Sequence, residues 1–404
     1  MPAVQRRCVF YVSGFDPKGA RHYHGLYRDQ AALQARVNGL SIEVGARHRA
    51  AGGAPGNSAW TLEARDEGVD VRTHYEFMAW DEVVRKHWPR TTGRLWWIIL
   101  ATTWLNLRTG TMWRMFKLCW PPAVALFGPF VALMAAIIGI PAGAAAAGGL
   151  ASRAGGSAPL AALAALAAGG ALAWLFLKLE SRYSMYWLMR SYAFTARQAR
   201  GQVPELDEVL DAQAARLLQR LRDGGDDEVL VVGHSSGAIM AVSIVARALR
   251  TNPAVFTKPG RVVSLMTLGH CFPMLGLLPQ ATVFRRELQA VLASPRVDWI
   301  DFSAPVDSSC FSLVDPAACF GESPVERRSG QPKLLSPRFA EMFHAGEYQA
   351  MRPDKFRIHF QYLMASGRPT LYDFFAITAG AKTLAERFKA VESVAHYRAL
   401  RPFG

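Results

Sequence analysis

The sequence has 404 residues, of which 51% are hydrophobic and only 19% are charged. Because charged residues average about 25% of a soluble domain, part of the chain is unusually apolar, and a disordered or collagen-like protein is excluded. The 46 Lys and Arg residues exceed the 32 Asp and Glu residues by 14, so an anionic partner is favoured: nucleic acid, an acidic protein or an anionic membrane. The five scattered cysteines lack the spacing of a metal site or a disulfide framework, which favours a reducing compartment.

The first 94 residues contain strand and helix patterns. The run 8–13, CVFYVS, is a short apolar segment typical of a buried strand, and the loop SGFDPKG follows it. Residues 20–40 have the pattern of a helix, while 60–64 and 69–77 alternate between apolar and polar residues as strands do. We therefore interpret residues 1–94 as the N-terminal part of an α/β domain.

The apolar excess is concentrated in the middle of the chain. No charged residue occurs between Lys117 and Arg153, and none between Arg153 and Lys178. Because a bilayer core requires about 20 apolar helical residues, these stretches predict two transmembrane helices, near 121–144 and 158–177. A hairpin rich in Ala and Gly that is buried in a soluble protein is the alternative. Aromatic residues near the ends of the segments are typical of a membrane interface: Trp113, Trp120, Trp174, Tyr183, Tyr186 and Trp187.

Basic residues flank the two apolar segments on their outer sides, while the linker holds only Arg153. By the positive-inside rule, this distribution places both flanking segments in the cytoplasm and a very short loop outside. We therefore expect residues 95–200 to be a membrane-associated insertion in an integral protein of a bacterial-type inner or plasma membrane. The same cations explain the net charge as attraction to anionic headgroups, so membrane lipids and no nucleic acid are the expected partners. The basic residues are Arg85, Lys86, Arg90, Arg94, Arg108, Arg114 and Lys117 before the segments, and Lys178, Arg182, Arg190, Arg197 and Arg200 after them.

Residues 201–404 alternate between strand and helix patterns. Their apolar runs are nearly continuous, which is typical of parallel strands covered on both faces. We expect an α/β fold whose mostly parallel sheet has helices on both faces and is interrupted by a two-helix transmembrane hairpin. The predicted elements are helices over 206–221 and 236–249 and strands over 228–232, 262–268 and 297–303.

The pentapeptide Gly233-His234-Ser235-Ser236-Gly237 fits the pattern G-x-S-x-G. It follows the apolar strand EVLVV and opens a helix of small and β-branched residues, which is the strand–turn–helix setting that the motif requires. Small residues two positions on either side of the central serine let the strand and the helix approach closely. The serine hydroxyl then stands clear of the sheet, beside the positive end of the helix.

In this motif and its setting, the sequence resembles the α/β-hydrolase superfamily, of the lipase and esterase kind, most strongly over 228–249. The resemblance implies an α/β-hydrolase-like sheet, Ser235 as the nucleophile and the Ser236 N–H as one donor of an oxyanion hole. The second donor in this superfamily comes from the loop after an early strand, which makes the Phe15 N–H the candidate. Many lipases have HG or HGGG in that loop, whereas this sequence has SG. The hairpin interrupts the domain before the motif, whereas inserted caps more often follow it.

A serine hydroxyl needs an adjacent base at neutral pH. The superfamily supplies its triad in the order Ser, then Asp or Glu, then His, which makes Ser235 the first member. His359, in KFRIHFQYL, follows all the predicted strands and fits the late position of the family's base, with His344 as the alternative. Asp307, in APVDSSC, lies just after a predicted strand, where open parallel sheets gather functional loops, and Asp315 is its main competitor.

The expected function is that of a membrane-anchored serine hydrolase. It would cleave carboxylic ester or thioester bonds, of a lipid or another apolar acyl ester, through a triad of Ser235, His359 and Asp307 and an acyl-enzyme. An acyltransferase with the same triad, or a non-catalytic membrane protein that retains the scaffold, are the alternatives. No metal and no organic cofactor are implied, and the sequence leaves the oligomeric state open.

Overall fold

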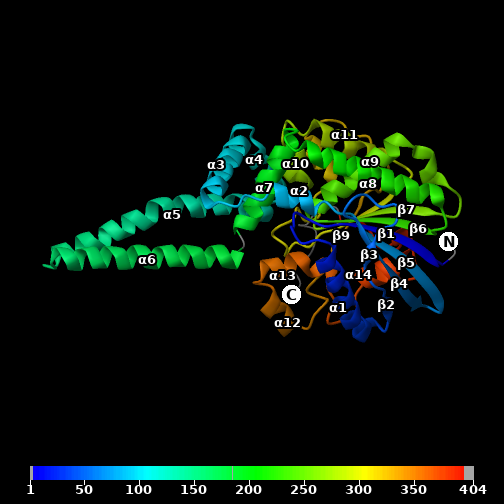
Figure 1. The fold of residues 1–404 in the computed structure, drawn as a ribbon, viewed down its shortest axis with the longest axis horizontal. Coiled ribbons are helices and arrows are strands. Elements are labelled where there is room, and N and C mark those ends of the chain that lie inside the picture. Colours follow the sequence, from blue (N-terminus) through cyan, green and yellow to red (C-terminus); the bar gives the residue numbers. More distant parts are fainter. Residues whose placement is uncertain (1–2, 184, 395–404) are drawn as a thin grey trace.

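The computed structural model describes residues 3–183 and 185–394. The strands in this part of the chain are β1 (Arg6–Val12), β2 (Ile42–Val44), β3 (His48–Arg49), β4 (Ser58–Asp66), β5 (Val69–Phe77), β6 (Glu228–His234), β7 (Val262–Leu268), β8 (Asp298–Phe302) and β9 (Lys333–Leu335). Within the described residues these nine strands form one mixed sheet in the order β2-β4-β5-β1-β6-β7-β8-β9, with β3 paired to β4 (Figure 1). The chain is therefore an α/β protein.

The sheet is parallel from β5 through β1 and β6 to β9, but its other edge is antiparallel. A tight turn explains the difference. Glu67 and Gly68 join β4 to β5 with φ of 52° and 83°, and a two-residue hairpin turn of this kind needs positive φ at both positions. No pattern in the sequence predicts the short strands β2, β3 and β9.

Helices cover both faces of the sheet (Figure 1). On one face lie α2 (Asp81–Lys86), α8 (Pro204–Asp223), α9 (Ser236–Thr251), α10 (Phe272–Gly276) and α11 (Thr282–Ala293). On the other face lie α1 (Ala20–Asn38), α12 (Ala345–Met351), α13 (Lys355–Phe360), α14 (Phe374–Ala379) and α15 (Leu384–Arg387). Short 3₁₀ helices occupy Pro253–Thr257, Pro316–Phe320 and Gln361–Leu363.

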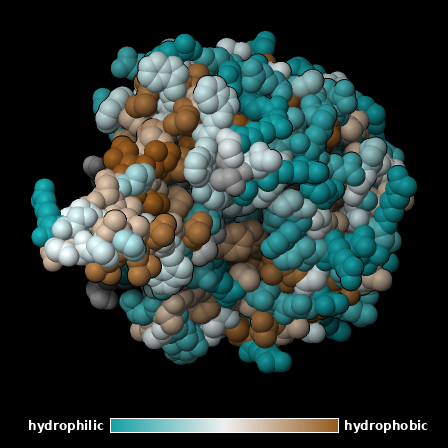
Figure 2. Space-filling model, turned by 60° about the vertical axis from the view of Figure 1, so that its left-hand side comes forward, coloured by the Kyte–Doolittle hydropathy of each residue, from teal (hydrophilic) through white to brown (hydrophobic). Residues whose placement is uncertain are grey.

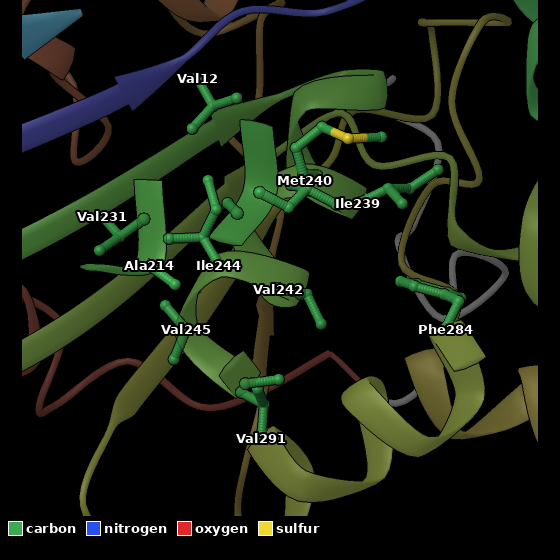
Figure 3. Close-up of a cluster of buried hydrophobic side chains, with 14 of the residues drawn as sticks. Val12, Ala214, Val231, Ile239, Met240, Val242, Ile244, Val245, Phe284 and Val291 are labelled. Atoms are coloured by element: carbon green, nitrogen blue, oxygen red, sulfur yellow. The ribbon is translucent and has the colours of Figure 1, made fainter. Parts of the chain in front are cut away.

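Two separate hydrophobic cores result from this arrangement. Successive strand residues point to opposite faces, so Phe10 and Val12 of β1 pack into one core, while Val9 and Tyr11 pack into the other. Both central strands, β1 and β6, are buried almost throughout, as their continuous apolar runs predict. In the first core, side chains of α9 fill the space between the sheet and the helices α8 and α11 (Figure 3).

The two long apolar helices, α5 (Trp120–Arg153) and α6 (Ala158–Tyr183), form a hairpin that projects from the rest of the molecule (Figure 1). Within residues 3–183 and 185–394, they are the two helices long and apolar enough to cross a membrane. The first helix extends beyond the predicted end at 144, because Ala, a strong helix former, dominates the segment that follows. In the apolar window of α6 no residue is buried, and apolar surface gathers on and beside the hairpin in Figure 2.

The base of the hairpin packs against a third hydrophobic core. It joins the first turns of α5 to three further helices, α3 (Thr92–Arg108), α4 (Thr111–Leu118) and α7 (Met185–Ala199). Ala123, Leu126 and Phe127 of α5 are buried there, together with Met189 and Tyr192 of α7. The hairpin is therefore fixed to the α/β domain at its base, and its remaining length is exposed.

The aromatic residues predicted to mark a membrane interface lie in different surroundings. Trp113, Trp120 and Trp174 are all more than half exposed. The side chain of Tyr183 lies outside the described residues. Tyr186 is partly buried against the third core. The Trp187 side chain lies at the candidate active site described below.

Candidate active site

The turn that carries Ser235 connects β6 to α9. Ser235 has φ of 58° and ψ of −125°, a backbone conformation that residues other than glycine rarely adopt. Its N–H donates a hydrogen bond of 2.8 Å to the Leu268 carbonyl at the end of β7, which fixes the turn to the neighbouring strand. Only 6% of the residue is exposed. This is the sharp strand-to-helix turn that the motif predicts.

The glycines of the motif are required by close backbone contacts. A Cβ atom on Gly237 would lie 2.3 Å from the Val12 carbonyl oxygen, and one on Gly233 would lie 2.6 Å from the Cα of Ala238. Gly14, in the loop after β1, lies so close that a Cβ there would be 3.0 Å from the Cβ of Ser235. The predicted oxyanion loop is therefore in contact with the serine.

His359 and Asp307 form a buried hydrogen-bonded pair. Nδ1 of His359, in α13, donates to Oδ2 of Asp307, in the loop after β8, at 2.8 Å, and each residue is 1% exposed. The Ser309 N–H donates to the other carboxylate oxygen at 2.9 Å. Burial alone would raise the pKa of Asp307, but the His359 imidazole and these hydrogen bonds hold it below its ordinary value.

This pairing determines the tautomer of His359. Because an ionised carboxylate only accepts hydrogen bonds, Nδ1 carries the proton, and Nε2 of the neutral ring is left as an acceptor. Nε2 is buried and has no hydrogen-bond partner among the described residues. It therefore makes no hydrogen bond to Ser235 in this structure, and such bonds often tighten only when a substrate is bound.

His234 connects the serine turn to the histidine. Its Nε2 donates to the main-chain carbonyl of His359 at 2.8 Å, and the centres of the two rings are 4.9 Å apart. Burial, with a smaller effect of the neighbouring His359, lowers the pKa of His234 to about 3. His234 is therefore neutral at physiological pH, and its single N–H holds the main chain of His359, the candidate base, in position.

Trp187 is the site residue that the sequence did not reveal. Its indole N–H donates to the Phe15 carbonyl at 3.0 Å, and its ring centre lies 6.1 Å from that of His359. Phe15 is also stacked on Trp88 at 5.6 Å. The Phe15 N–H donates a hydrogen bond to no described residue. Trp187 thus holds the carbonyl of the candidate oxyanion residue from the segment that follows the hairpin.

The alternative site residues lie elsewhere. His344 is exposed and forms the N-cap of α12, in a capping box with Glu347. Asp315 caps the 3₁₀ helix at Pro316–Phe320 and pairs with Arg327. The structure therefore brings Asp307 and His359 together beside the serine turn, whereas His344 and Asp315 take part in other contacts.

Cys271 is the other nucleophilic side chain close to this turn. Burial, reinforced by the nearby Asp307 carboxylate, raises the pKa of its thiol to about 12, although the Ser235 side chain has a smaller opposing effect. The thiol is therefore protonated at neutral pH and is a poor nucleophile. Among the described residues no group of three or more His, Cys, Asp or Glu side chains is placed to hold a metal ion.

The comparisons with known proteins add no relative. The chain matches no protein-family model, no curated protein and no solved structure. The chemistry of the site therefore has to be argued from its own geometry.

Proposed function

We propose that this protein is a membrane-anchored serine hydrolase of the α/β-hydrolase kind, which cleaves carboxylic esters or thioesters through an acyl-enzyme. The observation that carries the proposal is the 2.8 Å hydrogen bond between buried His359 and Asp307, next to the strained turn of Ser235. A hydroxyl on such a turn, a histidine with one free ring nitrogen and a carboxylate that orients it are the groups that acyl transfer needs.

In the proposed acylation, the Ser235 oxygen attacks the carbonyl carbon, and its proton passes to Nε2 of His359. Asp307 stabilises the imidazolium that forms, and the N–H groups of Phe15 and Ser236 bind the oxyanion of the tetrahedral intermediate. The bond from the carbonyl carbon to the leaving oxygen or sulfur then breaks, and His359 transfers its proton to that atom. The products of this half-reaction are a free alcohol or thiol and an acyl-serine.

In the proposed deacylation, water takes the place of the alcohol. His359 accepts a proton from the water as the water oxygen attacks the acyl carbon, and a second tetrahedral intermediate forms. The bond from that carbon to the serine oxygen breaks, the proton returns to Ser235, and a carboxylic acid leaves. One ester and one water are consumed for each acid and alcohol released.

The exposure of the hairpin supports the membrane anchor. An apolar helix with no buried residue in its central window cannot be a core helix of this domain, and water is an unfavourable environment for it. A bilayer satisfies both the apolar side chains and the internally hydrogen-bonded backbone. The basic residues beside the hairpin then favour the cytoplasmic side for both flanking segments.

Fluorophosphonate labelling tests the proposal on the detergent-solubilised full chain. We expect the wild type to be labelled and to release acid from a short-chain ester, and Ser235→Ala to lose labelling and at least about 10³-fold in kcat. Ser243→Ala is the matched control and should behave as the wild type, since Ser243 is a buried serine of α9 outside the site. Equal labelling of the wild type and Ser235→Ala would overturn the proposal. Ester formation with an added alcohol that outpaces acid release would assign acyl transfer instead of hydrolysis.

A further inference from the structure

A cavity of about 500 Å³ lies between the base of the hairpin and the side chain of His359. Its volume is within the range of small-molecule sites, about 300 to 1,000 Å³. Trp187, which holds the Phe15 carbonyl, also lines it. The cavity therefore reaches the candidate base His359 at one end and the first turns of α5 at the other.

The wall formed by α5 is apolar. It consists of Trp120, Pro121, Val124, Ala125, Gly128 and Pro129, whose spacing of about four residues places them on one face of the helix. The Phe356 side chain of α13, which is 42% exposed, contributes to the lining as well. Beyond the cavity, α5 continues as the exposed part of the hairpin, so its apolar surface extends without interruption toward the proposed bilayer.

The remaining wall carries positive charge. Arg352 and Lys355 line the cavity, and no Asp or Glu residue does. Neither side chain takes part in an ion pair with another described residue. A third cation, Lys18, lies 6.0 Å from the centre of the Phe356 ring. The cavity therefore has an apolar half next to the hairpin and a cationic edge next to α12 and α13.

We propose that this cavity is the substrate site and that its occupant is an acyl ester with a negatively charged headgroup, drawn from the bilayer around the hairpin. The apolar chain lies along α5, the ester carbonyl lies at Ser235 and His359, and the headgroup lies against Arg352 and Lys355. This assignment rests on the proposed hydrolase function and adds to it the class of substrate and its source.

A bulky side chain at Gly128 tests the apolar half. The Cβ position of Gly128 meets no atom within 4 Å, so a larger residue is accommodated in the cavity itself. We expect Gly128→Phe to lower the ratio of kcat/KM for a palmitoyl ester to kcat/KM for an acetyl ester by roughly tenfold or more. Gly139→Phe is the matched control, since Gly139 lies on the same helix with an equally open Cβ position but outside the cavity. An unchanged chain-length preference in Gly128→Phe would overturn the assignment of the acyl chain.

Neutralising the two cations tests the headgroup. The probes are palmitoyl lysophosphatidylglycerol, palmitoyl lysophosphatidylcholine and monopalmitoylglycerol. Each is presented in vesicles whose other lipids carry no net charge. We expect the wild type to prefer the anionic probe. In the double variant Arg352→Gln, Lys355→Gln, the ratio of kcat/KM for the anionic probe to kcat/KM for monopalmitoylglycerol should fall roughly tenfold. The double variant Arg36→Gln, Arg286→Gln removes two exposed charges elsewhere and should keep the preference. Equal use of the three probes by the wild type would overturn the headgroup assignment.

The source of the substrate is tested by presentation. Palmitoyl-coenzyme A supplies the same acyl chain and negative charge from solution, and we expect it to be hydrolysed more slowly than the anionic lysolipid in vesicles. Faster hydrolysis of the soluble thioester would overturn the bilayer source. The proposed function is tested separately from the substrate class. If the wild type hydrolyses the acetyl ester through Ser235, the hydrolase function stands, whatever the results with the palmitoyl probes.

Discussion

Two apolar helices of this protein, α9 and α6, have similar kinds of residues and opposite surroundings. In α9 every residue from Ser236 to Leu249 is buried, between the sheet on one side and α8 and α11 on the other (Figure 3). In α6 the apolar window contains no buried residue at all. Both helices are rich in Ala and in Leu, Ile or Val. An apolar sequence therefore specifies only that a helix avoids water, while the rest of the fold decides whether protein or lipid replaces the water.

The helix α5 combines both situations. Its first turns pack into the third core of the α/β domain, whereas no residue of α5 beyond Leu133 is buried. This junction is also where the cavity next to His359 lies. Apolar surface therefore has two roles in this protein: in α9 it packs in the core, and in the hairpin it is available to lipid. Substitutions that affect one role should leave the other unchanged.

A buried charge should separate the two helices most strongly. Val242 in α9 has no exposed surface, and Leu166 in α6 is 75% exposed. We expect Val242→Asp to abolish folding of the α/β domain, because an unpaired buried carboxylate costs more than about 4 kcal/mol. Leu166→Asp should change the free energy of unfolding of the domain by no more than about 0.5 kcal/mol, since the side chain is largely exposed and lies outside the three cores.

The same pair has a second readout in membranes. Leu166→Asp places a charge in the hairpin, where insertion scales assign it a cost of about 2.5 to 3.5 kcal/mol. Its membrane-bound fraction after alkaline extraction should fall, and denaturant unfolding followed by tryptophan fluorescence gives the domain stability. If Leu166→Asp unfolds the domain as Val242→Asp does, then α6 contributes to the stability of the α/β domain, and the contrast between the two helices is wrong.

Two glycines give the next largest contrast. An added methyl group on Gly237 would meet the carbonyl oxygens of Val12 and Ser13 at 2.3 and 2.4 Å, whereas one on Gly139 in α5 would meet nothing within 4 Å. We expect Gly237→Ala to lower the free energy of unfolding by about 3 kcal/mol and to abolish labelling of Ser235, since the helix must move away from β1. Gly139→Ala should be neutral or slightly stabilising, because Ala favours the helix. The free energies of unfolding of both variants are measured by urea unfolding in the same detergent. Equal decreases in the two variants would contradict this prediction.

The parts of the site that the sequence predicts are those with local patterns. The strand before Ser235 is continuously apolar and the residues around it are small, so both the turn and the close approach of α9 follow from one short segment. The sequence leaves a competitor for each of His359 and Asp307, because one lies in a helix and the other in a loop 52 residues away, and only packing brings them together.

The remaining features depend on contacts between distant segments. A tryptophan after an apolar segment suits a membrane interface as well as a site, so the hydrogen bond from Trp187 to Phe15 has no signature in the sequence. The cavity likewise arises from the packing of α5 near α13 and the loop after β8. The three-residue strands β2 and β9 are too short for a periodic pattern to be recognised.

Acidification should destabilise the domain and leave the hairpin unchanged. The pKa of His234 is lowered to about 3 by burial and by the neighbouring His359, while an unfolded histidine titrates near 6.5. Between these values the unfolded chain binds a proton that the folded chain does not, so stability is lost as the pH falls below about 6.5. We expect a loss of about 2 kcal/mol from this group between pH 7 and pH 5.

His234→Gln isolates this contribution. Glutamine keeps an N–H donor for the His359 carbonyl but does not titrate, so the decrease in stability between pH 7 and pH 5 should become smaller than in the wild type. Residues 120–152 contain no ionisable side chain, and the helical signal of the hairpin should not change over this range. An unchanged pH dependence in His234→Gln, measured by urea unfolding, would show that other groups cause the acid lability.

The smallest expected effect is on the fluorescence of two tryptophans, one exposed near the hairpin and one buried in the α/β domain. Trp97 of α3 is 71% exposed, whereas Trp60 of β4 is fully buried. If α3 rests on the membrane surface beside the hairpin, brominated lipids quench the emission of Trp97 and leave that of Trp60 unchanged, because such quenching acts over short range at the membrane interface. We expect Trp97→Phe to lower the quenchable fraction of the emission and Trp60→Phe to raise it, each slightly, since the chain contains 11 tryptophans. If Trp97→Phe instead raises the quenchable fraction and Trp60→Phe lowers it, then α3 does not lie on the membrane surface, and only the hairpin contacts lipid.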